Sequence, residues 1–295
     1  MKYGPLVFLA AFFALSASWC GLVLAPQVQL GRAIQETNSV MRTDLYPAGR
    51  PGVARQGLDV YRAEGCVYCH SQQVEQQGTL VDVVLTDAGK NSNAVAKALE
   101  DEQLGTFTGP GLAAGLPKPV ERNTSLEKAS ALVNLLKKAG ANSEMHLVPI
   151  GTDIERGWGA RRTVADDFLA DSPVMPGSQR VGPDLANVGA RLPDVNWQLM
   201  HLYAPRAVTK DSPMPSYRFL FEQKKIGKEP SPDALQQLPK EFAPGDGFEI
   251  VPKPEAKALA AYLVSLRADV PLYEAPLTPP PPTTNAPAAT NAPAK

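Results

Sequence analysis

The chain has few of the residues that build metal sites and cross-links. Its 295 residues include three cysteines and three histidines. A zinc site of four cysteines therefore lacks a ligand, and a scaffold held by several disulfides cannot form. An excess of charge of one sign is also missing, because 29 Lys and Arg residues face 30 Asp and Glu residues. This balance provides no bulk positive field for a phosphate backbone, and we expect no nucleic-acid partner.

Charged side chains are absent from Tyr3 to Leu30, and most of this stretch is apolar. Because about 20 apolar residues cross one bilayer, we predict that residues 1–30 form a transmembrane anchor. A cleaved signal peptide is the alternative, with Lys2 before the apolar stretch and small residues at Ser16 to Ser18. The anchor is favoured because apolar residues resume after that site. Both interpretations place the rest of the chain outside the cytoplasm.

The motif Cys66-Val67-Tyr68-Cys69-His70 is the strongest signal in the sequence. Two thiols three positions apart on one helical turn can each add to a haem vinyl group, and the next residue is then placed to bind the iron. We therefore predict one covalent haem c, attached at Cys66 and Cys69, with His70 as a ligand of the iron. The CxxC pair of a disulfide or half a zinc site is the alternative. The only other cysteine, Cys20, lies in the apolar segment, which disfavours a zinc site.

A second axial ligand has to come from outside this motif. Among the six methionines, Met175 and Met214 lie in proline-containing segments of the haem-bearing part. Met214 is favoured because its loop follows one helical segment and precedes the last one, which resembles the position from which class I cytochromes c supply the thioether; Met175 remains the alternative. A thioether opposite His70 would hold the iron low-spin and raise its potential. With both axial positions filled, the haem carries electrons and does not bind oxygen. We interpret His201 as a structural polar group rather than a ligand.

Two helices are expected to pack across each other, one over Ala54 to Glu64 and one that begins at Pro254. Between them, Arg180-Val181-Gly182-Pro183-Asp184-Leu185 resembles the segment after the haem histidine in class I cytochromes c. In that family a proline carbonyl accepts the imidazole N–H. Carried over, the proline is Pro183, and the bond would orient the ring of His70 and raise its basicity.

These stretches together resemble one family, subunit II of cbb3-type cytochrome c oxidases, the membrane-anchored monohaem cytochrome. The matching stretches are Leu45-Tyr46-Pro47, Gly57-Leu58-Asp59-Val60-Tyr61, Gly65 to Val74, Arg156-Gly157-Trp158-Gly159, Arg180 to Gly189, His201 to Arg206 and Ser212 to Tyr217. The resemblance strengthens Met214 as the distal ligand. It implies a catalytic partner subunit with haem b, a high-spin haem and copper, and it leaves open a further cytochrome c subunit. It also implies the bacterial inner membrane, a periplasmic haem domain, and no oxygen-reducing site on this chain.

Other functions stay open beside this one. The anchored cytochrome c subunit of a nitric oxide reductase, or an independent membrane-bound electron carrier, would use the same chemistry. A haem-based sensor belongs to another class and requires an open or labile axial site. The proteins that co-purify distinguish the first two from an oxidase subunit, and rapid carbon monoxide binding would favour the sensor.

Residues 79–149 interrupt the cytochrome, whose domain we assign to residues 31–78 and 150–275. The insertion is predicted to be a small α/β unit. Its expected strands are Thr79–Thr86, Lys118–Arg122 and Glu144–Pro149, and its expected helices are Asn91–Glu102, a short turn at Leu112–Gly115 and Ser125–Ala139.

This inserted domain resembles the carboxy-terminal domain of the bacterial ribosomal stalk protein. The similarity lies in Val81 to Leu85, Ala88 to Asn91, Ala94 to Ala98, Lys118 to Val120 and Leu135 to Ala141. The stalk protein's binding of translation factors is not carried over, because Asp101 to Pro110 lacks lysines. Docking to another subunit is favoured over a tolerated surface module.

The expected fold is therefore mainly α. A class I cytochrome c-like haem domain follows one N-terminal transmembrane helix and carries the small inserted α/β domain. Residues 276–295 are rich in Pro, Ala, Thr and Asn and are predicted to be a disordered tail.

Overall fold

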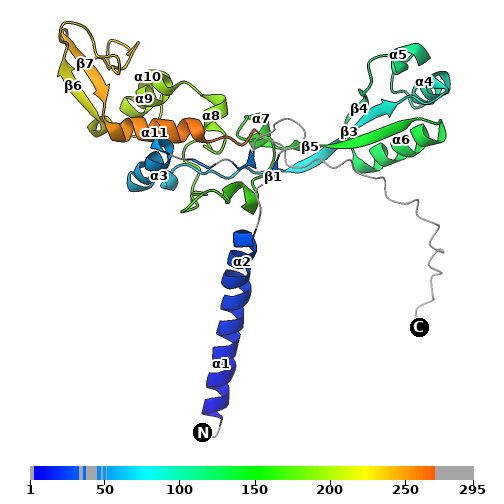
Figure 1. Cartoon of the computed structure of the whole chain (residues 1–295), viewed down its shortest axis with the longest axis horizontal. Coiled ribbons are helices and arrows are strands. Elements are labelled where there is room, and N and C mark those ends of the chain that lie inside the picture. The colour runs from blue at the N-terminus through cyan, green and yellow to red at the C-terminus, as the bar shows by residue number, and fades with distance from the viewer. Residues whose placement is uncertain (1–2, 33–35, 38–44, 48, 51, 270–295) are drawn as a thin grey trace. The chain divides into compact units, whose positions relative to one another are not determined.

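The computed structural model describes residues 3–32, 36–37, 45–47, 49–50 and 52–269. It divides into two compact units (Figure 1). Within the described residues, the first unit comprises the chain up to Glu75 together with the chain from Thr152, and the second comprises Gln76–Gly151. The predicted tail, residues 276–295, lies outside the described residues.

The chain begins with an apolar helix. Helix α1 (Gly4–Trp19) continues through the π-helical segment η1 (Cys20–Leu24) into α2 (Ala25–Arg32). The stretch Gly4–Gln29 has 26 residues, a mean hydropathy of 2.2 in its most apolar window and no residue of that window buried. A helix of this length and composition can cross a bilayer, which fits membrane anchoring; a signal sequence near the N-terminus would have the same properties.

The rest of the first unit is mostly helical, with two small sheets. Its elements are β1 (Glu36–Thr37), β2 (Leu45–Tyr46), α3 (Val53–Ala63), η2 (Cys66–Tyr68), α7 (Thr152–Glu155), η3 (Ala165–Phe168), α8 (Val188–Arg191), α9 (Val195–Tyr203), α10 (Pro205–Val208), η4 (Arg218–Leu220), β6 (Phe221–Lys225), β7 (Phe248–Pro252) and α11 (Pro254–Ser265). Strands β1 and β2 pair antiparallel, as do β6 and β7.

The core of this unit is the crossing of α3 and α11. A Cβ atom on Gly57 would lie 1.9 Å from the carbonyl oxygen of Ala258, so only glycine allows the two backbones to approach this closely. One turn further along each helix, the rings of Tyr61 and Tyr262 are buried with centroids 5.2 Å apart. Pro254 occupies the first turn of α11, where its missing N–H costs nothing. The predicted packing of these two helices is confirmed.

The second unit is a three-stranded antiparallel sheet with helices packed against it. The strand order is β4 (Lys118–Thr124), β3 (Gly78–Asp87), β5 (Asn142–Ile150), and the helices are α4 (Ser92–Asp101), α5 (Gly109–Ala113) and α6 (Leu126–Lys138). Alternate residues of β3 enter the core, where Val83 and Leu85 meet Met145 and Leu136. The predicted strands and long helices are confirmed, but α5 begins at Gly109, earlier than predicted.

Local capping explains where these helices begin and end. The side chains of Asn91 and Ser125 accept hydrogen bonds from the first turns of α4 and α6. Gly140, at φ +86°, follows α6 in the left-handed region that favours glycine. The two ends of the unit are adjacent, because the N–H of Gln77 donates to the carbonyl oxygen of Ile150 at 2.9 Å.

The prediction of a mainly α fold is only partly confirmed. Of the residues that the structure describes, 44% are helical and 15% lie in strands. Part of the strand content comes from the β6–β7 hairpin, which the sequence analysis did not predict. A long segment, Ile226 to Gly247, separates its strands, so the short turn that usually identifies a hairpin is missing.

Candidate haem site

A sharp turn brings the residues of the CxxCH motif together. Helix α3 ends at Ala63, and Gly65 takes a left-handed conformation at φ +71°. The 3-10 turn η2 follows, and the N–H of His70 donates to the carbonyl oxygen of Cys66 at 3.0 Å. Cys66 is buried, and burial raises the pKa of its thiol to about 12, whereas Cys69 is exposed.

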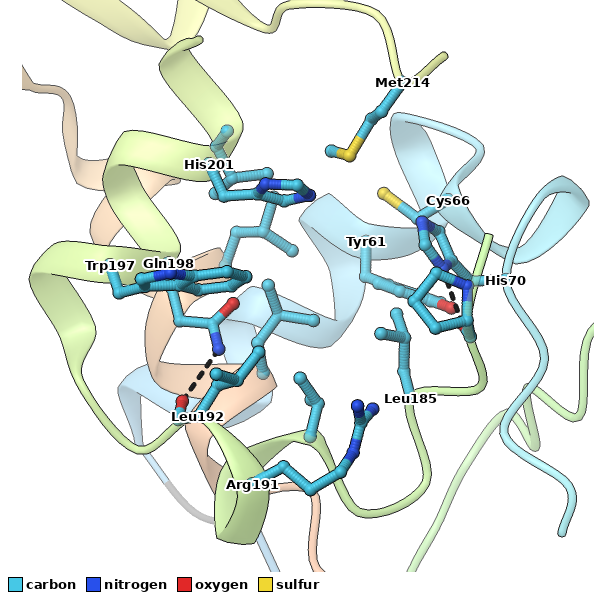
Figure 2. Close-up of a pocket in the computed structure, with 15 residues that line it drawn as sticks. Tyr61, Cys66, His70, Leu185, Arg191, Leu192, Trp197, Gln198, His201 and Met214 are labelled. Carbon is cyan, nitrogen blue, oxygen red and sulfur yellow. Dashed lines mark hydrogen bonds between the residues drawn. The ribbon is translucent and has the colours of Figure 1, made fainter. Parts of the chain in front are cut away.

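Cys66 and His70 line a cavity of about 570 Å³, a volume that includes the part open to solvent (Figure 2). Its walls come from α3, α8, α9 and α11 and from the loops that hold Pro183 and Met214. The lining is mostly apolar, with side chains such as Leu185, Leu202 and Leu259. The volume of the cavity and its mostly apolar lining suit an apolar ligand that is held by a few polar groups.

The imidazole of His70 is held in one tautomer. Its Nδ1 lies 2.8 Å from the carbonyl oxygen of Pro183. A carbonyl oxygen only accepts, so Nδ1 carries the proton and Nε2 has a free lone pair. Burial lowers the pKa of His70, which favours this neutral form. A Cβ atom on Gly182 would lie 2.3 Å from Cε1 of His70, so the ring position also requires glycine there.

Met214 reaches the same cavity from a loop between η4 and α10. Its N–H donates to the Ser212 hydroxyl at 3.3 Å, and the N–H of Tyr217 donates to the carbonyl oxygen of Leu202 in α9 at 2.8 Å. The flanking residues Pro213 and Pro215 further restrict the loop. Met175, the alternative ligand, is buried in the core and does not line this cavity.

Two nitrogen-bearing side chains of the cavity wall have atoms without a partner among the described residues. Arg191 donates through one guanidinium nitrogen to the carbonyl oxygen of Asp184 at 2.7 Å, but its Nε is buried and unpaired. Nδ1 of His201 is also buried and unpaired. The imidazole ring of His201 stacks on the ring of Trp197, with the ring centroids 5.0 Å apart. Burial, with a smaller effect of His70, lowers the pKa of His201 to about 4, so this ring is neutral near pH 7.

Arg191 is not among the site residues predicted from the sequence. A signal was present, since Arg191 lies one helical turn after Val188, which is buried on the same side of α8. Arg191 thus places a positive charge in a mostly apolar wall, close to the buried carboxylate of Asp184.

A polar network holds the segment that follows His70. Asp184 is fully buried and accepts hydrogen bonds from the Ser71 hydroxyl and, at 2.8 Å, from the N–H of Gln73. Arg180 donates to the Ser71 hydroxyl at 3.0 Å and pairs with Asp153 at 2.9 Å. Together these contacts fix the backbone on the side of the CxxCH motif that leads into the inserted unit.

The residues present fit a covalently attached haem. The cavity brings together a CxxC thiol, an imidazole with a free Nε2, a thioether and a cationic group. Soft sulfur and imidazole ligands are those that proteins use for haem iron. In the part of the chain that the structure describes, no group of three or more His, Cys, Asp or Glu side chains could hold a bare metal ion.

A family model described as "Cytochrome C oxidase, mono-heme subunit/FixO" matches residues 138–238. The matched range contains Pro183, Arg191, His201 and Met214, and it does not include the CxxCH motif.

Curated relatives match a shorter stretch, about a quarter of the chain. The chain is 37% identical over 73 residues to large ribosomal subunit protein bL12 of Oceanobacillus iheyensis, covering 24% of this chain and 61% of that protein. Against bL12 of Cytophaga hutchinsonii it is 37% identical over 71 residues, 24% of this chain and 58% of that protein. Against bL12 of Pseudoalteromonas translucida it is 34% identical over 87 residues, 29% of this chain and 72% of that protein.

The chain thus spans about 60% of the length of the first two bL12 proteins. These matches support the stalk-protein resemblance of the inserted unit only distantly. Over residues 138–238, about a third of its length, the chain is similar to the mono-haem subunit of a cytochrome c oxidase.

Proposed function

We propose that the chain is a membrane-anchored monohaem cytochrome c, the electron-transfer subunit II of a cbb3-type haem–copper oxidase. It would pass electrons to the partner subunit that reduces oxygen and that contains haem b, a high-spin haem and copper. The proposal leaves open whether the complex also contains a further cytochrome c subunit as a second partner. The observation that carries the proposal is the meeting of Cys66, His70 and Met214 at one apolar cavity, together with the FixO match over Met214.

The proposed domain organisation places this function on one part of the chain. Residues 1–30 form the anchor, residues 31–78 and 150–275 the haem domain, residues 79–149 the inserted domain and residues 276–295 the tail. The anchor would lie in the bacterial inner membrane, with the haem domain on the periplasmic side. The apolar helix Gly4–Gln29 and the division of the chain near Glu75 and Thr152 support this arrangement.

Each site residue has a defined part in the proposal. Cys66 and Cys69 would attach the haem through thioether bonds, and His70 and Met214 would be the axial ligands of its iron. The carbonyl oxygen of Pro183 accepts a hydrogen bond from Nδ1–H of His70, which would leave Nε2 to bind the metal and would raise its basicity. When bound, the haem supplies an iron that gains and loses one electron.

The surroundings of the site suit electron transfer. The mostly apolar walls would limit the contact of the haem with water, and low solvent exposure together with a thioether ligand raises a haem potential. Cys69 is exposed, and the neighbouring Tyr68 has 68% of its surface accessible. One of the two residues that would attach the haem therefore lies at the protein surface, where a redox partner can approach.

Purification of the tagged, full-length protein in mild detergent tests this proposal. We expect covalent haem c in a pyridine haemochrome spectrum, with haem b, copper and cyanide-sensitive oxygen uptake in the same sample. A co-purifying core with non-haem iron and no copper would instead identify a nitric oxide reductase subunit. Haem c without a partner would identify an independent carrier, and rapid carbon monoxide binding by the reduced haem would identify a sensor.

A further inference from the structure

His201 is a partly buried polar side chain of the cavity wall, and no hydrogen bond to its buried ring nitrogen is present among the described residues. It belongs to α9 and stacks almost parallel on Trp197, with ring centroids 5.0 Å apart and an interplanar angle of 10°. Its Nδ1 is inaccessible to solvent and has no partner among the described residues. A buried polar atom without a partner is destabilising, so a polar contact supplied by the ligand-bound site is expected here.

The backbone holds the Met214 loop against the helix that carries His201. The N–H of Tyr217 donates to the carbonyl oxygen of Leu202, the residue next to His201, at 2.8 Å. On the other side of the loop, Arg206 donates from Nε to the carbonyl oxygen of Ser212 at 3.3 Å. In Figure 2 the imidazole of His201 and the thioether of Met214 lie toward the same end of the cavity, and both line it.

Other polar side chains of the cavity have different roles. Gln198 donates to the carbonyl oxygen of Leu192 at 2.9 Å, and His70 donates to Pro183. Arg191 is bound to the carbonyl oxygen of Asp184. The hydroxyl of Tyr61 and Nε of Arg191 are also buried without a partner among the described residues, but in Figure 2 the Tyr61 hydroxyl points toward the His70 end and Arg191 lies far from Met214. His201 is thus the nitrogen donor best placed for a group at the Met214 end.

We propose that His201 is a positioning residue for Met214 and donates a ring N–H to the thioether sulfur. This inference rests on the proposed function, in which Met214 binds the haem iron. A thioether is a weak hydrogen-bond acceptor, and a neutral imidazole has one N–H to donate. The bond would hold the sulfur in the ligating orientation and withdraw electron density from it. Because oxidised iron gains more from sulfur donation than reduced iron, the bond would raise the reduction potential.

A matched pair of variants in the haem-loaded, full-length protein tests this inference. His201→Phe keeps an aromatic ring against Trp197 and removes the N–H, whereas His201→Tyr keeps the ring and restores a donor as a hydroxyl. We expect His201→Phe to lower the reduction potential and to shift the charge-transfer band of the bond between ferric iron and methionine sulfur. His201→Tyr should move both quantities back toward the wild-type values.

Three results would overturn the inference. The first is a His201→Phe protein with the wild-type potential and band, and the second is an equal change in both variants. The third is a lower potential with an unchanged band, which would mean that the N–H serves another group. If His201→Phe takes up no haem, His201→Gln is compared with the wild type by the same criteria. A His201→Gln protein with an altered potential and an unchanged band would again reject the hydrogen bond between His201 and Met214. A wild-type protein that has haem c but no iron–methionine band would reject the assignment of Met214 instead.

Discussion

The carbonyl oxygen of Pro183 accepts a hydrogen bond from Nδ1–H of His70, with 2.8 Å between the nitrogen and the oxygen, although the two residues are 113 positions apart in the chain. This bond spans the inserted unit in the sequence and determines which imidazole nitrogen is free. Since Nδ1 holds the proton, Nε2 is the nitrogen available to a metal. The CxxCH motif alone therefore does not determine which nitrogen of His70 can bind a metal. The hydrogen bond from the segment around Pro183 determines it.

The close fit of Gly182 against His70 gives a first prediction. In Gly182→Ala the new Cβ would lie 2.3 Å from Cε1 and 2.7 Å from Nδ1 of His70, so the ring has to move. We expect a loss of about 1–3 kcal/mol in the free energy of unfolding, the usual effect of overpacking, and a weakened iron–histidine bond. Denaturant unfolding and the ferric haem spectrum measure both effects.

Gly227→Ala is the matched control for this substitution. The nearest atom to its added Cβ is 4.0 Å away, and Gly227 does not take a left-handed conformation. The control should keep the wild-type spectrum. Equal behaviour of the two variants would show that Gly182 does not position His70.

The buried ring of Tyr262 predicts a loss of stability in alkali. Burial raises the pKa of Tyr262 from 10.0 to about 12, an effect that the hydrogen bond with Gln72 and the charge of Arg50 only partly offset. The unfolded chain loses this proton near pH 10 and the folded chain near pH 12. The free energy of unfolding should therefore fall as the pH rises from 10 to 12.

Tyr262→Phe isolates this contribution. The variant loses the hydrogen bond to Gln72, which we expect to cost about 1 kcal/mol at neutral pH, but its stability should depend less steeply on pH above 10. Denaturant unfolding at several pH values provides the comparison. Parallel curves for the two proteins would contradict the assignment of the pH dependence to Tyr262.

The buried carboxylate of Asp184 leads to a prediction about the stability of the segment that follows the haem motif. Its carboxylate is fully buried and accepts from the Ser71 hydroxyl, the N–H of Gln73 and the N–H of Ala186. Hydrogen bonds to charged groups each contribute about 1.5–3 kcal/mol, so Asp184→Asn should lower the free energy of unfolding by at least this amount. The variant should also show faster amide exchange at Gln73.

Asp246→Asn, at an exposed position, is the control for the change of charge. It should leave both the unfolding free energy and the exchange rate of Gln73 close to the wild-type values. Similar losses in Asp184→Asn and Asp246→Asn would mean that the network around Asp184 does not hold this segment.

The adjacent ends of the inserted unit predict that it can be removed. The N–H of Gln77 donates to the carbonyl oxygen of Ile150, so a short glycine linker can join residues 76 and 151. We expect the shortened protein to keep its covalent haem and its absorption spectrum. Val83→Asp in the full-length chain, which places a charge in the core of the insertion, should likewise leave the haem spectrum unchanged. Loss of haem c from both proteins would contradict an independent inserted domain.

Local patterns made much of the fold predictable. The strands and long helices of the inserted unit follow from alternation, helical periodicity and the caps at Asn91, Ser125 and Gly140. The crossing of α3 and α11 follows from a small residue and an aromatic residue one turn apart, Gly57 and Tyr61. The β6–β7 hairpin did not follow, because its pairing joins distant segments and most of the β6 side chains are exposed.

The part of the candidate site that a local sequence pattern defines was also predictable. The CxxCH motif is local, and the predictions for Pro183 and Met214 depended on a family resemblance. The structure puts both at the same cavity as His70. The positions of Arg191 and the unpaired nitrogen of His201 did not follow, because each depends on which face of a short helix meets the cavity. That face is set by tertiary packing rather than by the local sequence.

The central claim is that this chain delivers electrons to an oxygen-reducing partner through the haem at Cys66 and Cys69. The most direct test is oxygen uptake by the purified complex that contains Cys66→Ala and Cys69→Ala, compared with the wild-type complex at equal copper and haem b content. We predict that uptake driven by a reduced cytochrome c donor is lost while copper and haem b remain. Wild-type uptake by a complex without haem c on this chain would contradict the account.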